Sequence, residues 1–205
     1  GTSELAGLAI MQAVKKYDLP QGVFSLLQSS GYDAGASLVQ HPLIKAVGFT
    51  GSLGGGRALF DLCAARPEPI PFFGELGSVN PMFLMPHALG ARGAEIAAGW
   101  VGSLTMGAGQ FCTNPGIAIV IDGPDVDDFV SASREALSAI AAQTMLTDGI
   151  ADAYRAGQAR IAAAIGVREV FGSSSEGRQT TPHLYETDGD TWLANHALGE
   201  EVFGP

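Results

Sequence analysis

Residues 46–57 read AVGFTGSLGGGR, and this stretch decides the fold class. The first part, 46–50, is a short apolar run typical of a buried strand. The second part, Gly51–Gly56, is a glycine-rich turn, called the glycine turn below, and a helix is predicted after it over 57–65. Residues 70–73 predict another strand. Because the order is strand, turn, helix, strand, the sequence predicts a parallel sheet covered by helices, an α/β fold.

The rest of the chain continues this alternation. Ser3 is expected to cap a helix that runs to about Tyr17. Further predicted elements are strands at 23–27, 79–84, 117–121, 167–171 and 181–185, and helices at 88–106, 125–142 and 148–165, the helix at 125 being capped by its own aspartates. The tail is expected to be irregular. The pattern of predicted elements changes after Gly77, so two domains are predicted, 1–76 and 77–205.

The composition is that of a folded, acidic protein. Of 205 residues, 46% are hydrophobic and 16% are charged, which excludes a disordered chain. The net charge of -10 repels phosphate backbones, so no nucleic-acid partner is expected. There is no signal peptide and no membrane-length apolar run, and the two cysteines fit a reducing compartment, so we expect a cytoplasmic protein. The histidines have no ligand spacing, and no metal site is expected.

Cys112 is the first candidate for chemistry. It lies in the stretch GAGQFCTNPG, residues 107–116, after a long predicted helix. A thiolate nucleophile needs an accessible site and donors for an oxyanion, and the amides of a tight Gly/Pro loop supply such donors. Cys63 is the contrast, because its apolar helical neighbours indicate a buried packing residue.

Three other features are candidates, each with an ordinary alternative. The glycine turn, with Ser52, suits a phosphate at a helix start, or is a flexible turn. Glu75 follows a predicted strand and could act as a general base, or be a surface carboxylate in a loop. The final stretch Glu201–Pro205 could hold a ribose and flank a ring through Glu201 and Phe203, or form an ordinary turn.

In combination and in this order, these stretches resemble the aldehyde dehydrogenase superfamily. The matching stretches are Phe49–Ser52 with Gly56, Glu75–Gly77, Gly109–Thr113 and Glu201–Pro205. The resemblance implies a Rossmann-like cofactor-binding part followed by a catalytic domain. It implies that Cys112 attacks an aldehyde and that Glu75 activates water. It also implies that Gly51, Ser52, Glu201 and Phe203 bind NADP or NAD.

One branch of that superfamily is more similar still. Residues 74–81 read GELGSVNP, where common members read LELGGK, and this departure resembles the 2,5-dioxovalerate (alpha-ketoglutaric semialdehyde) dehydrogenases. That branch oxidises 2,5-dioxopentanoate to 2-oxoglutarate. Both ends of the chain look cut, so a fragment of a longer homodimeric or homotetrameric enzyme is expected, with poor cofactor binding and little turnover of its own.

Three other functions stay open at this point. The first is a CoA-acylating semialdehyde dehydrogenase, against which Glu75 speaks, because those enzymes lack the base. The second is a catalytically silent α/β binding or assembly module. The third is oxidation of fatty or aromatic aldehydes, since the residues of a substrate channel are dispersed along the chain.

Overall fold

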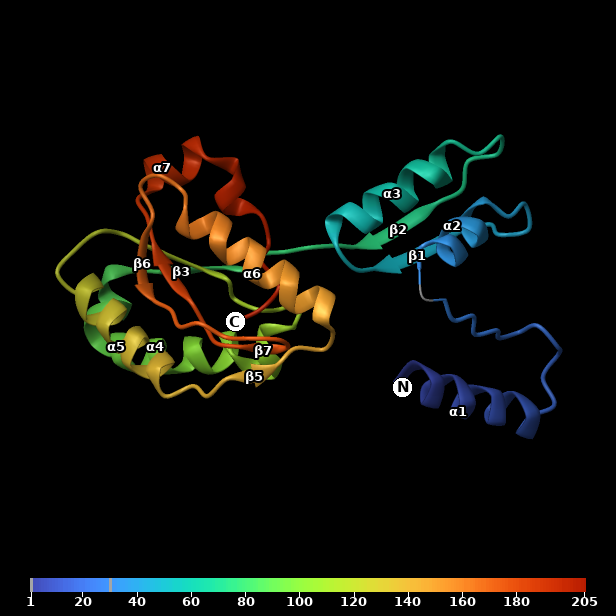
Figure 1. Ribbon diagram of the computed structural model, residues 1–205, viewed down its shortest axis with the longest axis horizontal. Helices are drawn as coiled ribbons and strands as arrows, with labels where there is room; N and C mark the ends of the chain where they lie inside the picture. Colours follow the sequence, from blue (N-terminus) through green and yellow to red (C-terminus); the bar gives the residue numbers. More distant parts are fainter. Residues whose placement is uncertain (1, 30) are drawn as a thin grey trace. The chain divides into compact units, whose positions relative to one another are not determined.

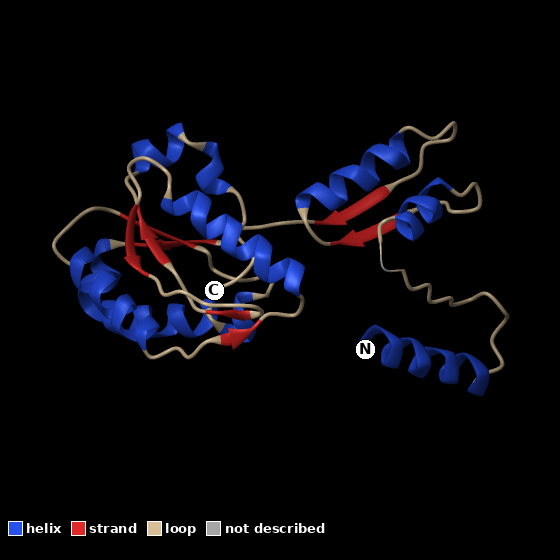
Figure 2. Cartoon of the chain, viewed as in Figure 1, coloured by secondary structure: helices blue, strands red, loops and turns tan. Residues whose placement is uncertain are grey.

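A computed structural model describes residues 2–29 and 31–205, and its elements are mixed helix and strand. The α/β class predicted from the sequence is therefore confirmed (Figure 2). The chain folds as two compact units, Gly1–Leu76 and Gly77–Pro205. Each unit has hydrogen-bonded strand pairs of its own.

The first unit is built around a parallel strand pair. β1 (Val47–Thr50) and β2 (Phe72–Glu75) pair in a register that ends with Thr50 opposite Glu75. α3 (Leu53–Ala64) connects the two strands and runs alongside them (Figure 1). Two further helices are α1 (Thr2–Lys16) and α2 (Asp33–Gln40). In this strand-helix-strand unit the carboxyl ends of both strands meet at one edge, where ligands bind in open α/β sheets.

Several sequence predictions for this unit were wrong. Residues 23–27 form no strand, because no segment in the described part of the chain pairs with them. Ser3 lies inside α1 rather than capping it, and α2 was not predicted. The strand predicted at 70–73 begins at Phe72, since the preceding Pro71 has no amide hydrogen for a ladder.

The second unit begins with another parallel pair. β3 (Pro81–Leu84) and β4 (Ile117–Val120) are joined by α4 (Pro86–Leu104) and the short 3-10 turn η1 (Met106–Gly109). The remaining elements are α5 (Val126–Ser138), β5 (Gln143–Thr144), α6 (Asp148–Ala162), β6 (Arg168–Phe171), β7 (Gln179–Thr180), β8 (Leu184–Glu186), α7 (Gly189–Ala194) and η2 (His196–Gly199). β5 pairs with β7 and β6 with β8, both antiparallel. No helix in the described ranges is long and apolar enough to cross a membrane.

The core of the second unit lies between the β3–β4 pair, α4 and α5. Trp100 and Phe129 stack there with ring centroids 5.7 Å apart, and Leu84, Leu89 and Ala97 are buried around them. Each fully buried side chain of this size stabilises the fold by about 1.5–3 kcal/mol. The Trp100 indole donates a 2.8 Å hydrogen bond to the carbonyl of Pro115, so this core also anchors the segment before β4.

Helix caps in this unit differ from the prediction. Asp125 makes no side-chain cap bond to α5, which ends at Ser138 rather than near 142. Thr147 instead caps α6, accepting a 3.2 Å bond from the Ile150 amide. The tail predicted to be irregular contains α7, whose first turn is capped by the Asp188 carboxylate. Hydrogen bonds from a backbone amide to a nearby side chain thus explain where α6 and α7 begin.

Candidate active site

The cysteine loop, residues 107–116, leaves α4 through a left-handed turn. Gly107, Ala108 and Gly109 have φ angles of 57°, 57° and 65°. This conformation favours glycine, and Ala108 adopts it at a cost in strain. The turn carries Cys112 to an exposed position. Within the described ranges, the backbone N–H of Cys112 has no hydrogen-bond acceptor, so it is free to stabilise an oxyanion.

The two cysteines lie in opposite environments. Cys63 is buried in α3 with 1% of its surface exposed, whereas Cys112 is exposed. Both are free thiols. An electrophile in solution therefore reaches Cys112 without unfolding, while Cys63 is protected as long as its unit stays folded.

Two residues that precede β3 hold the cysteine loop. The Asn80 side-chain amide donates to the carbonyl of Cys112 at 2.8 Å and to that of Asn114 at 2.9 Å. The Ser78 hydroxyl donates to the same Cys112 carbonyl at 3.1 Å. The backbone on both sides of Thr113 is therefore fixed by side chains about thirty residues earlier in the sequence.

The loop also packs tightly against the end of the chain. The Asn114 amide donates to the carbonyls of Leu104 at 2.9 Å and Gly109 at 3.0 Å. A Cβ added to Gly109 would lie 2.3 Å from the backbone of Gly204, and one added to Gly204 would lie 2.2 Å from the Tyr154 ring. Only glycine permits these approaches, so the loop, the final residues and α6 are closely packed.

The C-terminal stretch, Glu201–Pro205, returns to the segment before β3. The Glu201 carboxylate accepts a 3.4 Å hydrogen bond from the Ser78 amide, and a Cβ on Gly77 would lie 2.6 Å from one of its oxygens. Glu201 is half-buried, and Phe203 keeps 37% of its surface exposed. This second unit thus brings Cys112 into one packed arrangement with the stretch that carries Glu201 and Phe203.

In the first unit, the glycine turn and Glu75 are neighbours. The Gly51 amide donates to the Glu75 backbone carbonyl at 3.0 Å, extending the β1–β2 ladder by one bond. Ser52 caps α3, its hydroxyl oxygen accepting from the Gly55 amide at 3.2 Å, which leaves the hydroxyl hydrogen for a ligand. A Cβ on Gly54 would meet nothing within 4 Å, so the first turn of α3 is open to an approaching group.

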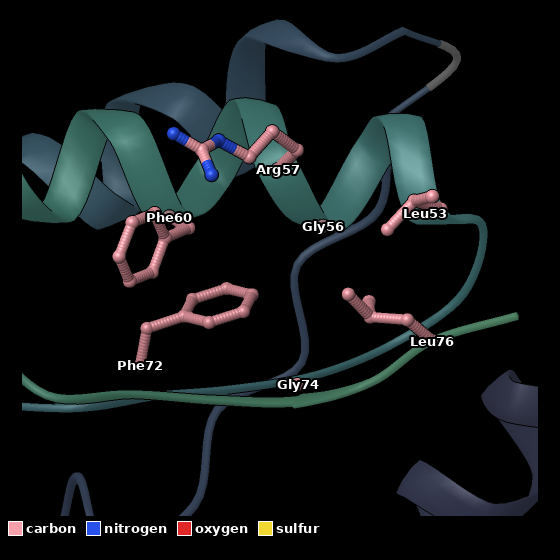
Figure 3. Close-up of a pocket in the computed structure, with 7 residues that line it drawn as sticks. All are labelled: Leu53, Gly56, Arg57, Phe60, Phe72, Gly74 and Leu76. Atoms are coloured by element: carbon pink, nitrogen blue, oxygen red, sulfur yellow. The ribbon is translucent and has the colours of Figure 1, made fainter.

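A close contact fixes the end of β2 against α3. A Cβ on Gly56 would lie 2.2 Å from the Leu76 side chain, so the absence of a side chain there lets Leu76 approach the helix. Figure 3 shows Leu76 and Leu53 at one end of an apolar pocket of about 300 Å³, with Phe60 and Phe72 at the other. Glu75 itself is exposed.

Burial shifts the pKa values of three polar side chains beside the C-terminal stretch. Desolvation raises the pKa of Tyr154 above its ordinary value, and its hydroxyl donates to the carbonyls of Thr181 and Pro205. Desolvation lowers the pKa of His183, against the opposing effect of Glu169, whose carboxylate lies 3.8 Å away. It also raises the pKa of Tyr185 to about 12. The tyrosines are neutral at pH 7 even at their ordinary pKa, and the lowered pKa of His183 favours its neutral imidazole there.

The described residues place the candidates in two groups. Gly51, Ser52 and Glu75 lie together in the first unit, and Cys112 lies with the C-terminal stretch in the second. Sequence reasoning missed Asn80, which holds the cysteine loop, and Tyr154, which holds the C-terminal stretch. The one available signal for Asn80 was the departure from the common LELGGK pattern at residues 74–81.

Comparison with known sequences identifies the family. The profile of the aldehyde dehydrogenase family matches residues 1–153. The chain is 52% identical to alpha-ketoglutaric semialdehyde dehydrogenase 2 of Azospirillum brasilense and 43% identical to alpha-ketoglutaric semialdehyde dehydrogenase of Acinetobacter baylyi. Both alignments cover 100% of this chain and 39% of the relative. The chain therefore spans about two fifths of the length of these curated relatives.

Comparison with solved structures agrees. The fold matches a variant of proline utilization A from Bradyrhizobium japonicum with a TM-score of 0.80 and 26% identity, over 100% of this chain and 21% of that one. It matches a cysteine-to-alanine variant of aldehyde dehydrogenase C from Pseudomonas syringae, in complex with NAD+ and octanal, with a TM-score of 0.79 and 25% identity, over 98% of this chain and 43% of that one. By profile, sequence identity and fold, the chain belongs to the aldehyde dehydrogenase family.

Proposed function

We propose that the protein carrying this chain oxidises an aldehyde to a carboxylic acid with NAD or NADP, and that Cys112 is its nucleophile. The observation that carries the proposal is that the Cys112 thiol is exposed on a hydrogen-bonded loop, and that no acceptor among the described residues takes the Cys112 N–H. The curated relatives, named for a semialdehyde dehydrogenase activity, support the same reaction class. The first unit then belongs to the cofactor-binding domain, and the second to the catalytic domain.

Cys112 begins the proposed reaction. Its thiolate adds to the aldehyde carbon, forming a C–S bond and an alkoxide, and the Cys112 N–H donates to that alkoxide. The nicotinamide cofactor, when bound, accepts the hydride. Loss of the hydride restores the C=O bond and leaves a thioester on Cys112.

Glu75 completes the proposed cycle. Its carboxylate, exposed at the carboxyl end of β2, takes a proton from water, and the resulting hydroxide attacks the thioester carbon. The C–S bond then breaks, which releases the carboxylic acid and returns Cys112 as a thiolate. The proton taken from water stays on Glu75 until it is lost to solvent. A general base of this kind distinguishes an enzyme that releases a free acid from a CoA-acylating enzyme. In the latter, the thiol of CoA attacks the thioester in place of water.

Four residues are proposed to hold the cofactor. The open first turn of α3 fits a pyrophosphate, because the helix start favours anions and the Ser52 hydroxyl hydrogen has no acceptor among the described residues. Gly51 contributes by lacking a side chain, since its amide is already bonded to β2. Glu201 and Phe203 are proposed for the nicotinamide ribose and ring, with the carboxylate shifting from the Ser78 amide toward the sugar hydroxyls.

The proposed substrate is 2,5-dioxopentanoate, which would be converted to 2-oxoglutarate. The identities of 52% and 43% to two alpha-ketoglutaric semialdehyde dehydrogenases support this choice over a fatty or aromatic aldehyde. A semialdehyde of this kind carries a carboxylate, so its enzyme must recognise a negative charge as well as the reacting carbonyl.

The test is an aldehyde screen on the protein that carries this chain, expressed at the length of its curated relatives. NADH or NADPH formation is followed with 2,5-dioxopentanoate, octanal and benzaldehyde, with and without CoA. Free acid is expected without CoA, with 2,5-dioxopentanoate giving the highest kcat/KM. Cys112→Ala should lower kcat by about a thousandfold or more. Cys63→Ala, at the buried thiol, should stay close to wild type, and an active Cys112→Ala enzyme would refute the mechanism.

A further inference from the structure

We propose that Asn80 is a positioning residue for the nucleophile, and that its side-chain amide sets the backbone orientation of Cys112. The inference rests on the proposed function, because it assigns a role in the reaction of Cys112. It concerns a residue that the reaction itself does not consume. Asn80 touches the loop backbone rather than the thiol, so it acts through Cys112.

The geometry of the Asn80 amide is that of a clamp. Both of its N–H groups are used, one toward the Cys112 carbonyl at 2.8 Å and one toward the Asn114 carbonyl at 2.9 Å. An amide NH₂ has two donors in one plane, so both acceptors are fixed relative to each other. Thr113, between them, cannot rotate its flanking peptides without breaking one of the bonds.

The backbone of Asn80 is specialised for this task. Its φ of 40° lies in the left-handed region, which asparagine tolerates better than most residues other than glycine. Pro81 follows immediately and begins β3, so the strained residue joins the clamp to a strand in the core sheet. The loop is thereby fixed to β3, rather than to another flexible segment.

Ser78 supplies a second donor to the same carbonyl. Its hydroxyl reaches the Cys112 oxygen at 3.1 Å, so that oxygen accepts from two side chains. The Cys112 carbonyl is thus held facing Ser78 and Asn80, and the peptide plane that it shares with Thr113 is fixed. The thiol and the backbone N–H belong to the same residue, Cys112. Their orientation toward a bound aldehyde therefore depends on how this peptide plane is held.

Two substitutions separate the clamp from other effects. Asn80→Asp keeps the shape and removes both donors, whereas Asn80→Gly removes the side chain and relaxes the positive φ. Asn195→Asp is the matched control, since it adds the same charge in the same unit and its Oδ1 still accepts from the Ala197 amide. All are made in the protein carrying this chain, expressed at the length of its relatives, beside Cys112→Ala.

Each variant is measured for kcat, KM and cysteine alkylation. Iodoacetamide labelling of Cys112 is quantified by peptide mass spectrometry, and the fold of the second unit is followed by the fluorescence of Trp100, which is buried in its core. Both Asn80 variants are expected to lower kcat about 10- to 100-fold, the scale of misplacing a reacting group. They should slow alkylation of Cys112, leave the cofactor KM within about twofold, and keep the Trp100 emission of wild type.

Three results would overturn the inference. They are activity within twofold of wild type in both Asn80 variants, loss of activity in Asn80→Asp alone, and loss accompanied by a shift of the Trp100 emission toward that of the unfolded protein. The second result would trace the effect to added charge, and the third to a general scaffolding role. An inactive Cys112→Ala beside unaffected Asn80 variants refutes this inference alone, whereas an active Cys112→Ala refutes the proposed function.

Discussion

His183 shows how burial at a single residue makes stability depend on pH. Its imidazole lies beside Glu169 and the Tyr185 hydroxyl, 3.3 Å from its Nδ1, and edge-on to the Tyr154 ring. Desolvation lowers its pKa below the ordinary 6.5, more strongly than Glu169 raises it. As the pH falls below 6.5, the unfolded chain therefore takes up this proton first, and the folded state loses stability.

The corresponding prediction is that His183→Gln flattens the loss of stability between pH 7 and pH 5. The free energy of unfolding is measured by urea denaturation across this range in both proteins. His87→Gln serves as the control, because His87 is exposed on α4 and its replacement should leave the slope as in wild type. Equal slopes in wild type and His183→Gln would show that this imidazole is not held in its neutral form.

At the scale of elements, the cysteine loop depends on its packing against the C-terminal stretch. Gly109→Ala places a Cβ 2.3 Å from the Gly204 backbone and forces alanine to adopt a φ of 65°. The expected loss in unfolding free energy is about 2–4 kcal/mol, from strain and displaced backbone together. Gly116→Ala is the matched control within the loop, because its Cβ would lie 3.5 Å from the nearest atom.

The outcome of this comparison is read from chemical denaturation and from Cys112 alkylation. Gly109→Ala should also change the alkylation rate at Cys112, since the backbone that carries the thiol must move. Gly116→Ala should leave both quantities near the wild-type values. Equal stability of the two variants would contradict the close packing of loop and stretch.

Elements with strong local signals were predicted well from the sequence. β4 and α6 lie close to the predicted segments, because an apolar run and an amphipathic repeat are encoded by neighbouring residues. The strand expected at 23–27 failed because strands need a partner, which no local pattern specifies. The aspartate cap expected for α5 failed because the N-cap residue Asp125 has a helical backbone conformation, with φ -89° and ψ -4°, in place of the extended one typical of a cap.

The residues of the candidate site also differ in how far the sequence could predict them. Cys112 stands out locally, as a cysteine in a Gly/Pro-rich loop after a long helix. Asn80 and Tyr154 do not, because their bonds reach 32 residues to Cys112 and 51 residues to Pro205. Only the folded chain brings such distant groups together, so the pattern at residues 74–81 could single out Asn80 but not its bonds to the cysteine loop.

At the scale of the whole molecule, the proposed reaction draws on both units. In the proposal, Glu75 and the glycine turn come from the first unit, and Cys112 and the C-terminal stretch come from the second. The profile of the aldehyde dehydrogenase family matches residues of both units. Because the chain covers 39% of its curated relatives, turnover is to be tested in a protein of their length.

The most direct test of the account is to trap the acyl group on Cys112. Glu75→Gln removes the proposed base, so hydride transfer should proceed once while thioester hydrolysis slows. The variant is mixed with 2,5-dioxopentanoate and NADP, quenched in acid and digested for peptide mass spectrometry. A burst of NADPH and an acyl adduct on the Cys112 peptide are expected, and both should be absent in Cys112→Ala. Unchanged steady-state turnover, or an adduct on any other residue, would contradict the proposed mechanism.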